Sequence, residues 1–421
     1  MTPEWNPNME QLNKRRIERH HRRRKETVRR RRRKTLTMVV VCLTMIALGL
    51  GVFFLVRHGE NKEPEQQVQQ NTQPAQYALA DATVIHLVAA GDVNVTDAIV
   101  ASGGSDYDYT ETFMDVAHLL AEGDLTVVNF EGNLCDAPYG DSRSAPQSFA
   151  EALDRCGVDM MQLANSYSIY QGISGLQATI QGVKNAGMEP LGVYADERAY
   201  KAGKGYTIKE VEGVKIAFVA FTKGMDGMTL PQGSENCVNL LYSDYDSTYQ
   251  DVNTKAIDTV LDAVAEEKPD LTVAMLHWGS EYNDNISKTQ ENVAQLLQDR
   301  GVDVILGTHP HYVQKITHDP ATGNFVAYSL GDLISDGQKA GTEYSIILNL
   351  EITKTAEDTK VTGYSYTPIF TVAERGSSLR SVRIAEAMVA YEGEHIRAVK
   401  PETYEDLTYA LGRIEDRISG E

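Results

Sequence analysis

The side chains best suited to chemistry stand where short apolar runs end. They are Asp92, Asn129, Glu131, His277, His309 and His311. Such apolar runs are typical of buried strands, and ligands of α/β proteins bind outside the carboxyl ends of those strands. Carboxylate, amide oxygen and imidazole together suit Mn²⁺, Zn²⁺ or iron. The set therefore predicts a divalent metal site. A pair of ions about 3.5–4 Å apart would activate water to hydrolyse a phosphate or an amide.

Each of these residues, taken alone, also has a purely structural interpretation. An aspartate after a strand, such as Asp92, commonly forms a turn or a helix cap. Asn129 and Glu131 point to the same face of a strand, as a structural hydrogen-bonded pair would, and His277 alone fits a core histidine. Two imidazoles on either side of Pro310 are more specific. The coincidence of all six residues at strand ends is what favours a site.

Alternating apolar and amphipathic segments from about Thr83 onward would position these side chains. The expected buried strands are 84–92, 125–132, 215–222, 271–279, 303–311 and 324–332. The expected amphipathic helices are Ile173–Ala186, Thr254–Glu267 and Ser287–Arg300, and Tyr404–Ile418 is also helical in character. Strand–helix alternation predicts an α/β fold with both sheet faces covered. We expect this domain to span residues 83–372, with a C-terminal helical extension over 373–421.

Residues 36–56 form an uncharged apolar run of 21 residues, LTMVVVCLTMIALGLGVFFLV. As a helix it would be about 31 Å long, enough to cross the hydrocarbon core of a bilayer. It exceeds the roughly 7–15 apolar residues of a signal peptide, and no small-residue cleavage site follows it directly. We therefore predict an uncleaved transmembrane signal anchor. A cleaved signal peptide and a buried core helix are the alternatives.

Charge is distributed unevenly along the chain. Residues 1–37 contain 14 Lys and Arg and four Glu, a net charge of +10, which leaves −29 for residues 38–421 because the whole chain carries −19. The basic flank of a membrane span faces the cytoplasm. This predicts a single-pass protein of the cell membrane with a basic cytoplasmic tail (1–35) that contacts anionic lipid head groups. Residues 57–82, rich in Gln and Pro, are interpreted as an extracellular linker before an extracellular main domain.

Two function classes are disfavoured by composition. The acidic main body argues against nucleic-acid binding. Four cysteines in 421 residues exclude a disulfide scaffold, and the lack of a Cys-x-x-Cys motif disfavours a thiolate zinc site. Cys135 and Cys156 would face a compartment that permits disulfides, but the sequence leaves their pairing open.

Several motifs resemble the poly-γ-glutamate capsule biosynthesis protein family, the CapA family. The matching segments are AAGDVNV (89–95), NFEGNL (129–134), LANSYSIYQGISGL (163–176), LHWGSEY (276–282), ILGTHPHYVQ (305–314) and VAYSLGD (326–332). The resemblance covers roughly residues 84–335 and implies a four-layer α/β/β/α sandwich of the calcineurin-like metallophosphatase type. It implies metal-binding positions at Asp92, Glu131, His277, His309 and His311, and further signature positions at Asn129 and Glu281.

The chain departs from this family's pattern in two segments. The family usually has Leu-Ala-Asn-Asn-His where this chain continues from Asn165 to Ser166 and Tyr167. A serine hydroxyl is a weaker neutral ligand than an amide oxygen. A tyrosine with a pKa near 10 is a poorer proton shuttle at neutral pH than a histidine. Asp332 likewise stands where the family has Asn. These replacements favour one surviving metal position over a complete two-metal catalytic site.

Three functions fit these observations. The first is a membrane-anchored protein that handles poly-γ-glutamate or another cell-envelope polymer, together with its synthesis machinery, by metal-assisted hydrolysis or transfer. Its candidate catalytic groups are Asn165, Tyr167 and Glu281. The second is a binding or scaffold protein that kept the fold and lost the reaction, for which tyrosines in the former catalytic loop suit an interface. The third is a metal-dependent phosphodiesterase or phosphatase, on analogy of fold alone.

Overall fold

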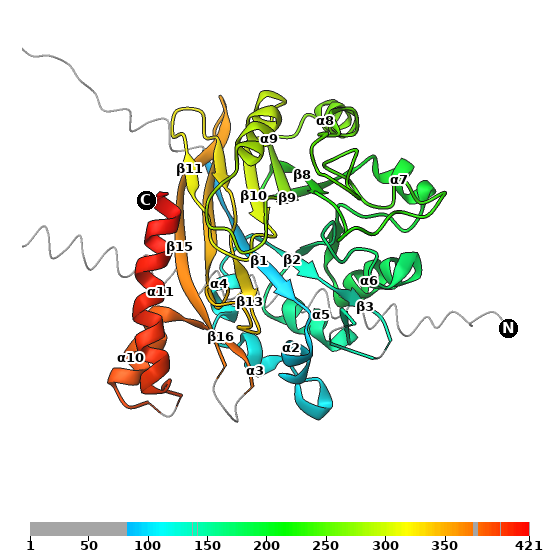
Figure 1. Ribbon diagram of the computed structural model, residues 1–421. Helices are drawn as coiled ribbons and strands as arrows, with labels where there is room; N and C mark the ends of the chain where they lie inside the picture. The colour runs from blue at the N-terminus through cyan, green and yellow to red at the C-terminus, as the bar shows by residue number, and fades with distance from the viewer. Residues whose placement is uncertain (1–81, 137, 141, 374–377, 396, 421) are drawn as a thin grey trace, which may run out of the picture. The chain divides into compact units, whose positions relative to one another are not determined.

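The computed structural model describes residues 82–420, apart from 137, 141, 374–377 and 396. The predicted basic tail, the signal anchor and all but the last residue of the linker lie outside these residues. Within the described part, no helix is long and apolar enough to cross a membrane. The described residues form two β-sheets and the helices around them (Figure 1).

The larger sheet has the strand order β16-β15-β14-β1-β2-β5-β6, and β13 also pairs with β1. Its strands are β1 (Thr83–Asn94), β2 (Leu125–Glu131), β5 (Met160–Gln162), β6 (Glu189–Leu191), β13 (Asp332–Ile334), β14 (Tyr344–Lys354), β15 (Thr359–Val372) and β16 (Arg380–Arg383). β1, β2, β5 and β6 run parallel, whereas β14, β15 and β16 extend the sheet in antiparallel fashion. The carboxyl ends of β1 and β2 therefore lie at the same edge.

The smaller sheet has the strand order β11-β12-β10-β9-β8-β7. Its strands are β7 (Tyr206–Val211), β8 (Val214–Thr222), β9 (Leu271–His277), β10 (Val304–Thr308), β11 (Ile316–His318) and β12 (Phe325–Ala327). The four central strands β8, β9, β10 and β12 are parallel. A separate pair, β3 (Asn133–Leu134) and β4 (Ser144–Ala145), follows β2. The smaller sheet thus has its own set of parallel strands, whose carboxyl ends lie at one edge.

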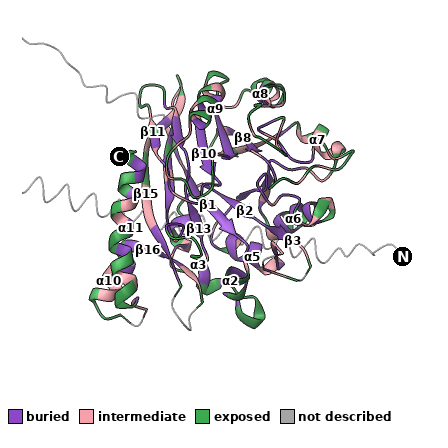
Figure 2. Cartoon of the chain, viewed as in Figure 1, coloured by how far each residue is buried: buried purple, intermediate pink, exposed green. Residues whose placement is uncertain are grey.

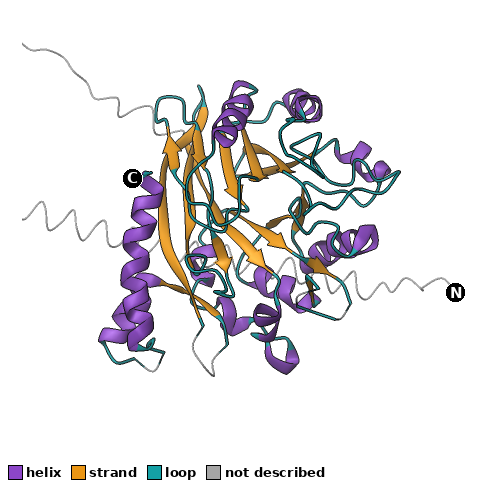
Figure 3. Ribbon diagram, viewed as in Figure 1, coloured by secondary structure: helices purple, strands orange, loops and turns teal. Residues whose placement is uncertain are grey.

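Apolar residues fill the space between the two sheets. Leu87 and Val127 of the larger sheet share one core with Phe218 and Met275 of the smaller sheet, and the buried strands run through the centre of Figure 2. The opposite face of the larger sheet is covered by α2 (Asp97–Ala101), α3 (Thr110–Phe113), α4 (Ala117–Leu120), α5 (Gln147–Arg155) and α6 (Gly172–Ala186). That of the smaller sheet is covered by α8 (Thr254–Glu267) and α9 (Lys288–Asp299) (Figure 3). The predicted mixed α/β class is confirmed.

The amphipathic helices form where the sequence predicts them, because their ends carry strong local signals. The Asn253 side chain accepts a hydrogen bond from the Ala256 amide at the start of α8. Ser287 and Gln290 form a reciprocal capping box at the start of α9. Gly187 ends α6 in the left-handed conformation, with φ of 102°. Two shorter elements complete the order, the 3-10 helix η1 (Gly104–Asp106) and α7 (Glu197–Gly203).

The C-terminal segment contributes more than a helical extension. β16 pairs with β15, a strand that the charged sequence after Val372 does not reveal. Two helices follow, α10 (Ile384–Glu392) and α11 (Pro401–Ser419), and α11 lies along β15 in Figure 1. Leu407 and Ile414 of α11 join the core between the sheets, so this segment is integral to the larger sheet. Cys135 and Cys156, whose pairing the sequence leaves open, are free thiols.

Candidate metal centre

The polar strand ends of both sheets meet at one place. In the larger sheet, Asp92 of β1 lies in register with Asn129 of β2, which ends two residues later at Glu131. In the smaller sheet, β9 ends at His277, and the segment after β10 carries His309. Parallel pairing places these carboxyl ends side by side within each sheet. The packing of the two sheets then brings the two sets together.

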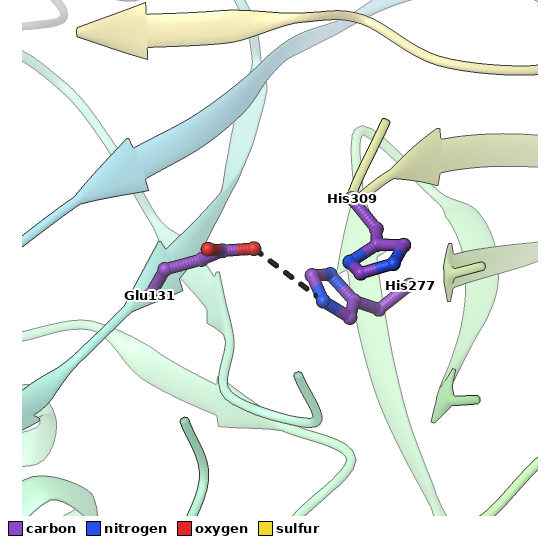
Figure 4. Close-up of side chains that lie close together, drawn as sticks. All are labelled: Glu131, His277 and His309. Atoms are coloured by element: carbon purple, nitrogen blue, oxygen red, sulfur yellow. Dashed lines mark ion pairs between the residues drawn. The ribbon is translucent and has the colours of Figure 1, made fainter. Parts of the chain in front are cut away.

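Two groups of ligand atoms form there and share one carboxylate. Glu131, His277 and His309 make the first group, and Asp92, Glu131 and His311 make the second. Within each group one ligand atom per residue lies within 4.8 Å of the others, and all five residues are buried. Figure 4 shows the imidazoles of His277 and His309 beside the Glu131 carboxylate, which is 3.4 Å from His277 Nε2. Glu131 stands where a bridging ligand between two ions would stand.

Two asparagines hold these carboxylates rather than face open space. Asn129 Nδ2 donates to Asp92 Oδ1 at 2.6 Å and to Glu131 Oε1 at 3.3 Å. Asn165 Nδ2 in turn donates to Asn129 Oδ1 at 3.1 Å and to the Phe130 carbonyl at 2.7 Å. Both side chains are buried. Asn165 therefore fixes Asn129 in place.

The turn after β10 is held in a strained conformation. His309 and His311 have φ of 93° and 58°, a region in which residues other than glycine cost about 1–3 kcal/mol each and which recurs at functional sites. The His309 amide donates to Asp92 Oδ2 at 3.0 Å. This bond ties the turn of the smaller sheet to the carboxylate of the larger one.

The second group is rich in protons. Burial raises the pKa of Asp92, raises that of Glu131 well above its ordinary value, and raises that of Asp332 to about 7. Burial alone would lower the pKa of His311, but the carboxylates of Asp332, Glu131 and Asp92 raise it well above its ordinary value. Three buried carboxyl groups thus face one imidazole. A divalent cation would supply the positive charge that these groups lack.

The electrostatics of the first group favour the neutral form of its two imidazoles. Burial lowers the pKa values of both His277 and His309 well below the ordinary value, and the other nearby cations lower them further. Among the described residues, His309 Nδ1 is buried and has no hydrogen-bond partner. A buried polar atom without a partner is costly, and a neutral imidazole nitrogen is a metal ligand. The residues of both groups therefore fit a metal ion.

The departing loop lies directly against the first group. Ser166 Oγ is 3.0 Å from His277 Nε2. The neighbouring Tyr167 ring lies under the Arg143 guanidinium, 4.1 Å from its centre. Burial, and next the Glu131 charge, raise the pKa of Tyr167. Its hydroxyl therefore stays protonated at neutral pH and can donate a hydrogen bond, but it is a poor proton acceptor.

Two other predicted residues lie at different depths. Asp332 is buried, and its Oδ1 is 2.9 Å from His311 Nδ1. The same nitrogen lies 3.4 Å from Asp92 Oδ2, so Asp332 adjoins the second ligand group directly. Glu281 is exposed and lies outside the buried groups. It lines a cavity of about 260 Å³ together with Ser166 and His309.

A larger cavity of about 330 Å³ opens beside His311, and its lining includes residues that the sequence analysis did not select. They are Asn94, Arg143, Tyr282 and Lys339. Asn94 lies two residues after Asp92, and Tyr282 is in the segment 276–282, so both had a signal in the motifs. Arg143 and Lys339 lie in loops with no spacing that marks them.

Comparison with known proteins gives a consistent result. Residues 86–337 match the family described as bacterial capsule synthesis protein PGA_cap. The capsule biosynthesis protein CapA of Bacillus anthracis is 29% identical over 262 residues, which are 60% of this chain and 60% of that protein. The PGA biosynthesis protein CapA of Bacillus subtilis (strain 168) is 23% identical over 250 residues, 59% of this chain and 62% of that protein. The similarity thus spans about three fifths of these relatives' length.

Solved structures resemble the chain more distantly. A novel phosphatase from Mycoplasma pneumoniae gives a TM-score of 0.44 at 14% identity, over 68% of this chain and 94% of that one. The calcineurin-like phosphoesterase YfkN from Bacillus subtilis gives 0.42 at 13% identity, over 78% and 99%. These TM-scores are too low to assign chemistry to the centre, which depends on the residues of this chain.

Proposed function

This chain belongs to the family of bacterial capsule synthesis proteins, and we propose that it acts in the synthesis of poly-γ-glutamate or another cell-envelope polymer through a divalent metal centre. The capsule and PGA biosynthesis proteins that it resembles support the pathway. The two facing sheets, with ligands at their strand ends, support assignment to the calcineurin-like metallophosphatase type.

One observation carries the proposal of a metal-assisted reaction. Two groups of buried ligand atoms share Glu131, with Asp92 and His311 on one side and His277 and His309 on the other. When bound, divalent ions in such an arrangement polarise a substrate oxygen and lower the pKa of a bound water. Hydrolysis or transfer at an amide or a phosphate is the chemistry that this supports.

The chain's own residues would hold and orient the reactants. Asp332 fixes the imidazole of His311 through the bond to Nδ1. Asn129 and Asn165 keep the carboxylates in place from the side away from the cavities. Tyr167, which lines the larger cavity, would donate a hydrogen bond to a substrate oxygen. It would not shuttle a proton, because its pKa is raised.

We further propose where this reaction occurs. The uncharged run 36–56 anchors the protein in the cell membrane, with the basic tail in the cytoplasm and the domain from residue 83 onward outside. Residues 57–82 would hold the domain off the membrane surface. Protease treatment of intact cells should then remove the domain and leave the N-terminal tail protected.

A second function is favoured by Ser166 and Tyr167. Where the family has an amide ligand and a histidine, this chain offers a hydroxyl and a tyrosine stacked under Arg143. A protein that binds the polymer or its synthesis machinery without cleaving it would tolerate both replacements. In this case the metal would stabilise the centre rather than react.

One experiment separates the two. The full-length chain in detergent, supplied with Mn²⁺, is incubated with poly-γ-glutamate, and polymer length is followed by gel electrophoresis beside Glu131→Gln. Shortening or lengthening by the wild type alone supports the metal-assisted reaction. Binding without a change in polymer length supports the scaffold. If the protein showed neither binding nor reaction, both proposed functions would be contradicted.

A further inference from the structure

The two cavities beside the metal centre differ in charge. The larger one, beside His311, is lined by the cations Arg143 and Lys339. It also contains Asp332 and Asp336, but Asp332 is bound to His311 Nδ1 at 2.9 Å, and Asp336 Oδ1 accepts from the Gln338 amide at 3.0 Å. The smaller cavity, beside His309, has one cation and two carboxylates, Lys223, Asp226 and Glu281. The larger cavity therefore balances two cations against two carboxylates, whereas the smaller one holds an excess of negative charge.

The two cavities are lined by different members of the centre. Ser166 and His309 line the smaller one, and their near neighbours Tyr167 and His311 line the larger one. The ligand groups follow the same division, because His309 belongs to one group and His311 to the other. A ligand whose reacting part lies over Glu131 would therefore place its two ends in cavities of different charge.

Arg143 is positioned to bind an anion. The Asn133 amide, two residues after Glu131, donates to the Arg143 carbonyl at 2.6 Å. This bond and the adjoining β3–β4 pair bring Arg143 close to Glu131. Its guanidinium stacks on Tyr167 and donates from Nη1 to the Val95 carbonyl at 3.1 Å. No carboxylate lies within ion-pair distance of it in the described part of the chain. The fork of a guanidinium matches the paired oxygens of a carboxylate or a phosphate.

Lys339 faces the same cavity from the loop after β13. Its Nζ lies 5.2 Å from the centre of the Tyr282 ring, and that ring stacks on His311 with 5.5 Å between centres. Among the described residues Lys339 also has no ion-pair partner. Two unpaired cations at one cavity are informative in a chain whose residues 38–421 carry −29, because most other charge there is negative.

We infer that Arg143 and Lys339 form an anion subsite, which binds a carboxylate or phosphate group of the ligand on the His311 side of the centre. This inference deepens the proposed function and rests on it for the ligand, a γ-linked glutamate chain with one free carboxylate per unit. The subsite sets specificity, and Arg143 and Lys339 take no part in proton transfer.

The test measures binding of a fluorescein-labelled γ-glutamate decamer to the full-length chain in detergent, with Mn²⁺ and about 150 mM salt, where charges far apart are screened. Arg143→Gln and Lys339→Gln should each weaken binding about tenfold, the effect of losing a hydrogen bond to a charged group. Arg143→Lys should fall between wild type and Arg143→Gln. Lys255→Gln, on the exposed face of α8, should change affinity less than about twofold.

Inorganic polyphosphate serves as the second probe. If the wild type binds only polyphosphate and both Gln variants weaken it, the subsite stands and the proposed polymer is wrong. If the wild type binds the decamer but Arg143→Gln and Lys339→Gln match Lys255→Gln, the subsite is overturned and the proposed function survives. Equal losses in all three Gln variants would also overturn the subsite, because they would reflect net charge. Thermal melting of each variant establishes that it is folded.

Discussion

The two halves of the centre share Glu131 but differ in their other side chains, which are mainly carboxyl groups in one half and imidazoles in the other. The Asp92–His311 half gathers three buried carboxyl groups, counting Asp332, around an imidazole whose pKa is raised. The His277–His309 half presents two imidazoles whose pKa values are lowered by burial, and one of them has an unpaired nitrogen. Burial thus favours the protonated carboxyl groups of the first half, whereas it favours the neutral imidazoles of the second half, the form that binds a metal ion.

The departures from the family pattern affect the two halves differently. Ser166 contacts His277, so a weaker ligand enters the histidine half, whereas Asp332 adds a carboxylate beside His311 in the other half. We therefore expect two ions of unequal affinity. The tighter one would lie between Asp92, Glu131 and His311, and the weaker one beside His277, His309 and Ser166. The predictions below test this inequality.

The largest effect should come from the shared ligand. Glu131→Gln should weaken both ions, and by more than the roughly 100-fold that loss of an outer partner costs at most. His311→Ala and His277→Ala should each remove mainly the ion of their own half. Calorimetric titration with Mn²⁺ measures the two affinities. If Glu131→Gln affected a single ion, Glu131 would not bridge the halves.

The next largest effect should come from pH. The pKa values of Asp92, Glu131 and His311 are raised, and that of the neighbouring Asp332 is raised to about 7. A metal ion that binds to the carboxylate half must therefore displace protons. Affinity in this half should therefore rise as pH rises from 5 to 8, by about tenfold per pH unit for each proton released.

The histidine half should respond less to pH. The pKa values of His277 and His309 are already lowered, so these imidazoles are neutral over most of that range. Titrations of His277→Ala, which keeps mainly the carboxylate half, and of His311→Ala should show the two slopes separately. Equal slopes would remove the electrostatic distinction between the halves.

A smaller gain is expected from restoring the family residue. Ser166→Asn replaces a hydroxyl by an amide oxygen next to His277 and should tighten the weaker ion about tenfold, equivalent to about 1.4 kcal/mol. Ser166→Ala is the matched control and should not tighten it. If Ser166→Asn tightened the carboxylate half instead, the assignment of Ser166 to the histidine half would be wrong.

The smallest effect should come from the C-terminal helix. Arg417 of α11 is buried, stacks on Tyr312 at 4.3 Å and donates to the Gly341 carbonyl at 3.4 Å, so it supports the turn and the loop on the His311 side. Arg417→Ala should weaken the tighter ion about threefold, below the roughly tenfold of a direct outer partner. Arg413→Ala, which also loses a bond to Asp284, is the control on the same helix. An equal effect on both ions would show general destabilisation.

The fold could be predicted from sequence wherever one segment carries its own signal. α8 spans Thr254–Glu267 as expected, and β2 and β9 begin where their apolar runs begin. β16 could not be predicted, because Arg380–Arg383 is a charged segment that becomes a strand only by pairing with β15. The long strands β14 and β15 were also missed.

The candidate site divides in the same way. Strand-end residues such as Asp92 and His277 could be selected because parallel strands bring their carboxyl ends to one edge. Arg143 and Lys339 could not, since their place depends on loops that fold back from a distance. Asn165 could be selected from the motif, but only its hydrogen bonds to Asn129 and Phe130 reveal that it supports other side chains.

The most direct test of this account is a count of bound metal. The full-length chain is loaded with Mn²⁺, Zn²⁺ or Fe²⁺, and elemental analysis is done before and after dialysis, beside the His309→Ala/His311→Ala double variant. The account predicts two ions per chain with metal present, one retained after dialysis, and neither in the double variant. A folded wild type that retains no ion, or a double variant that retains as many as the wild type, would contradict it.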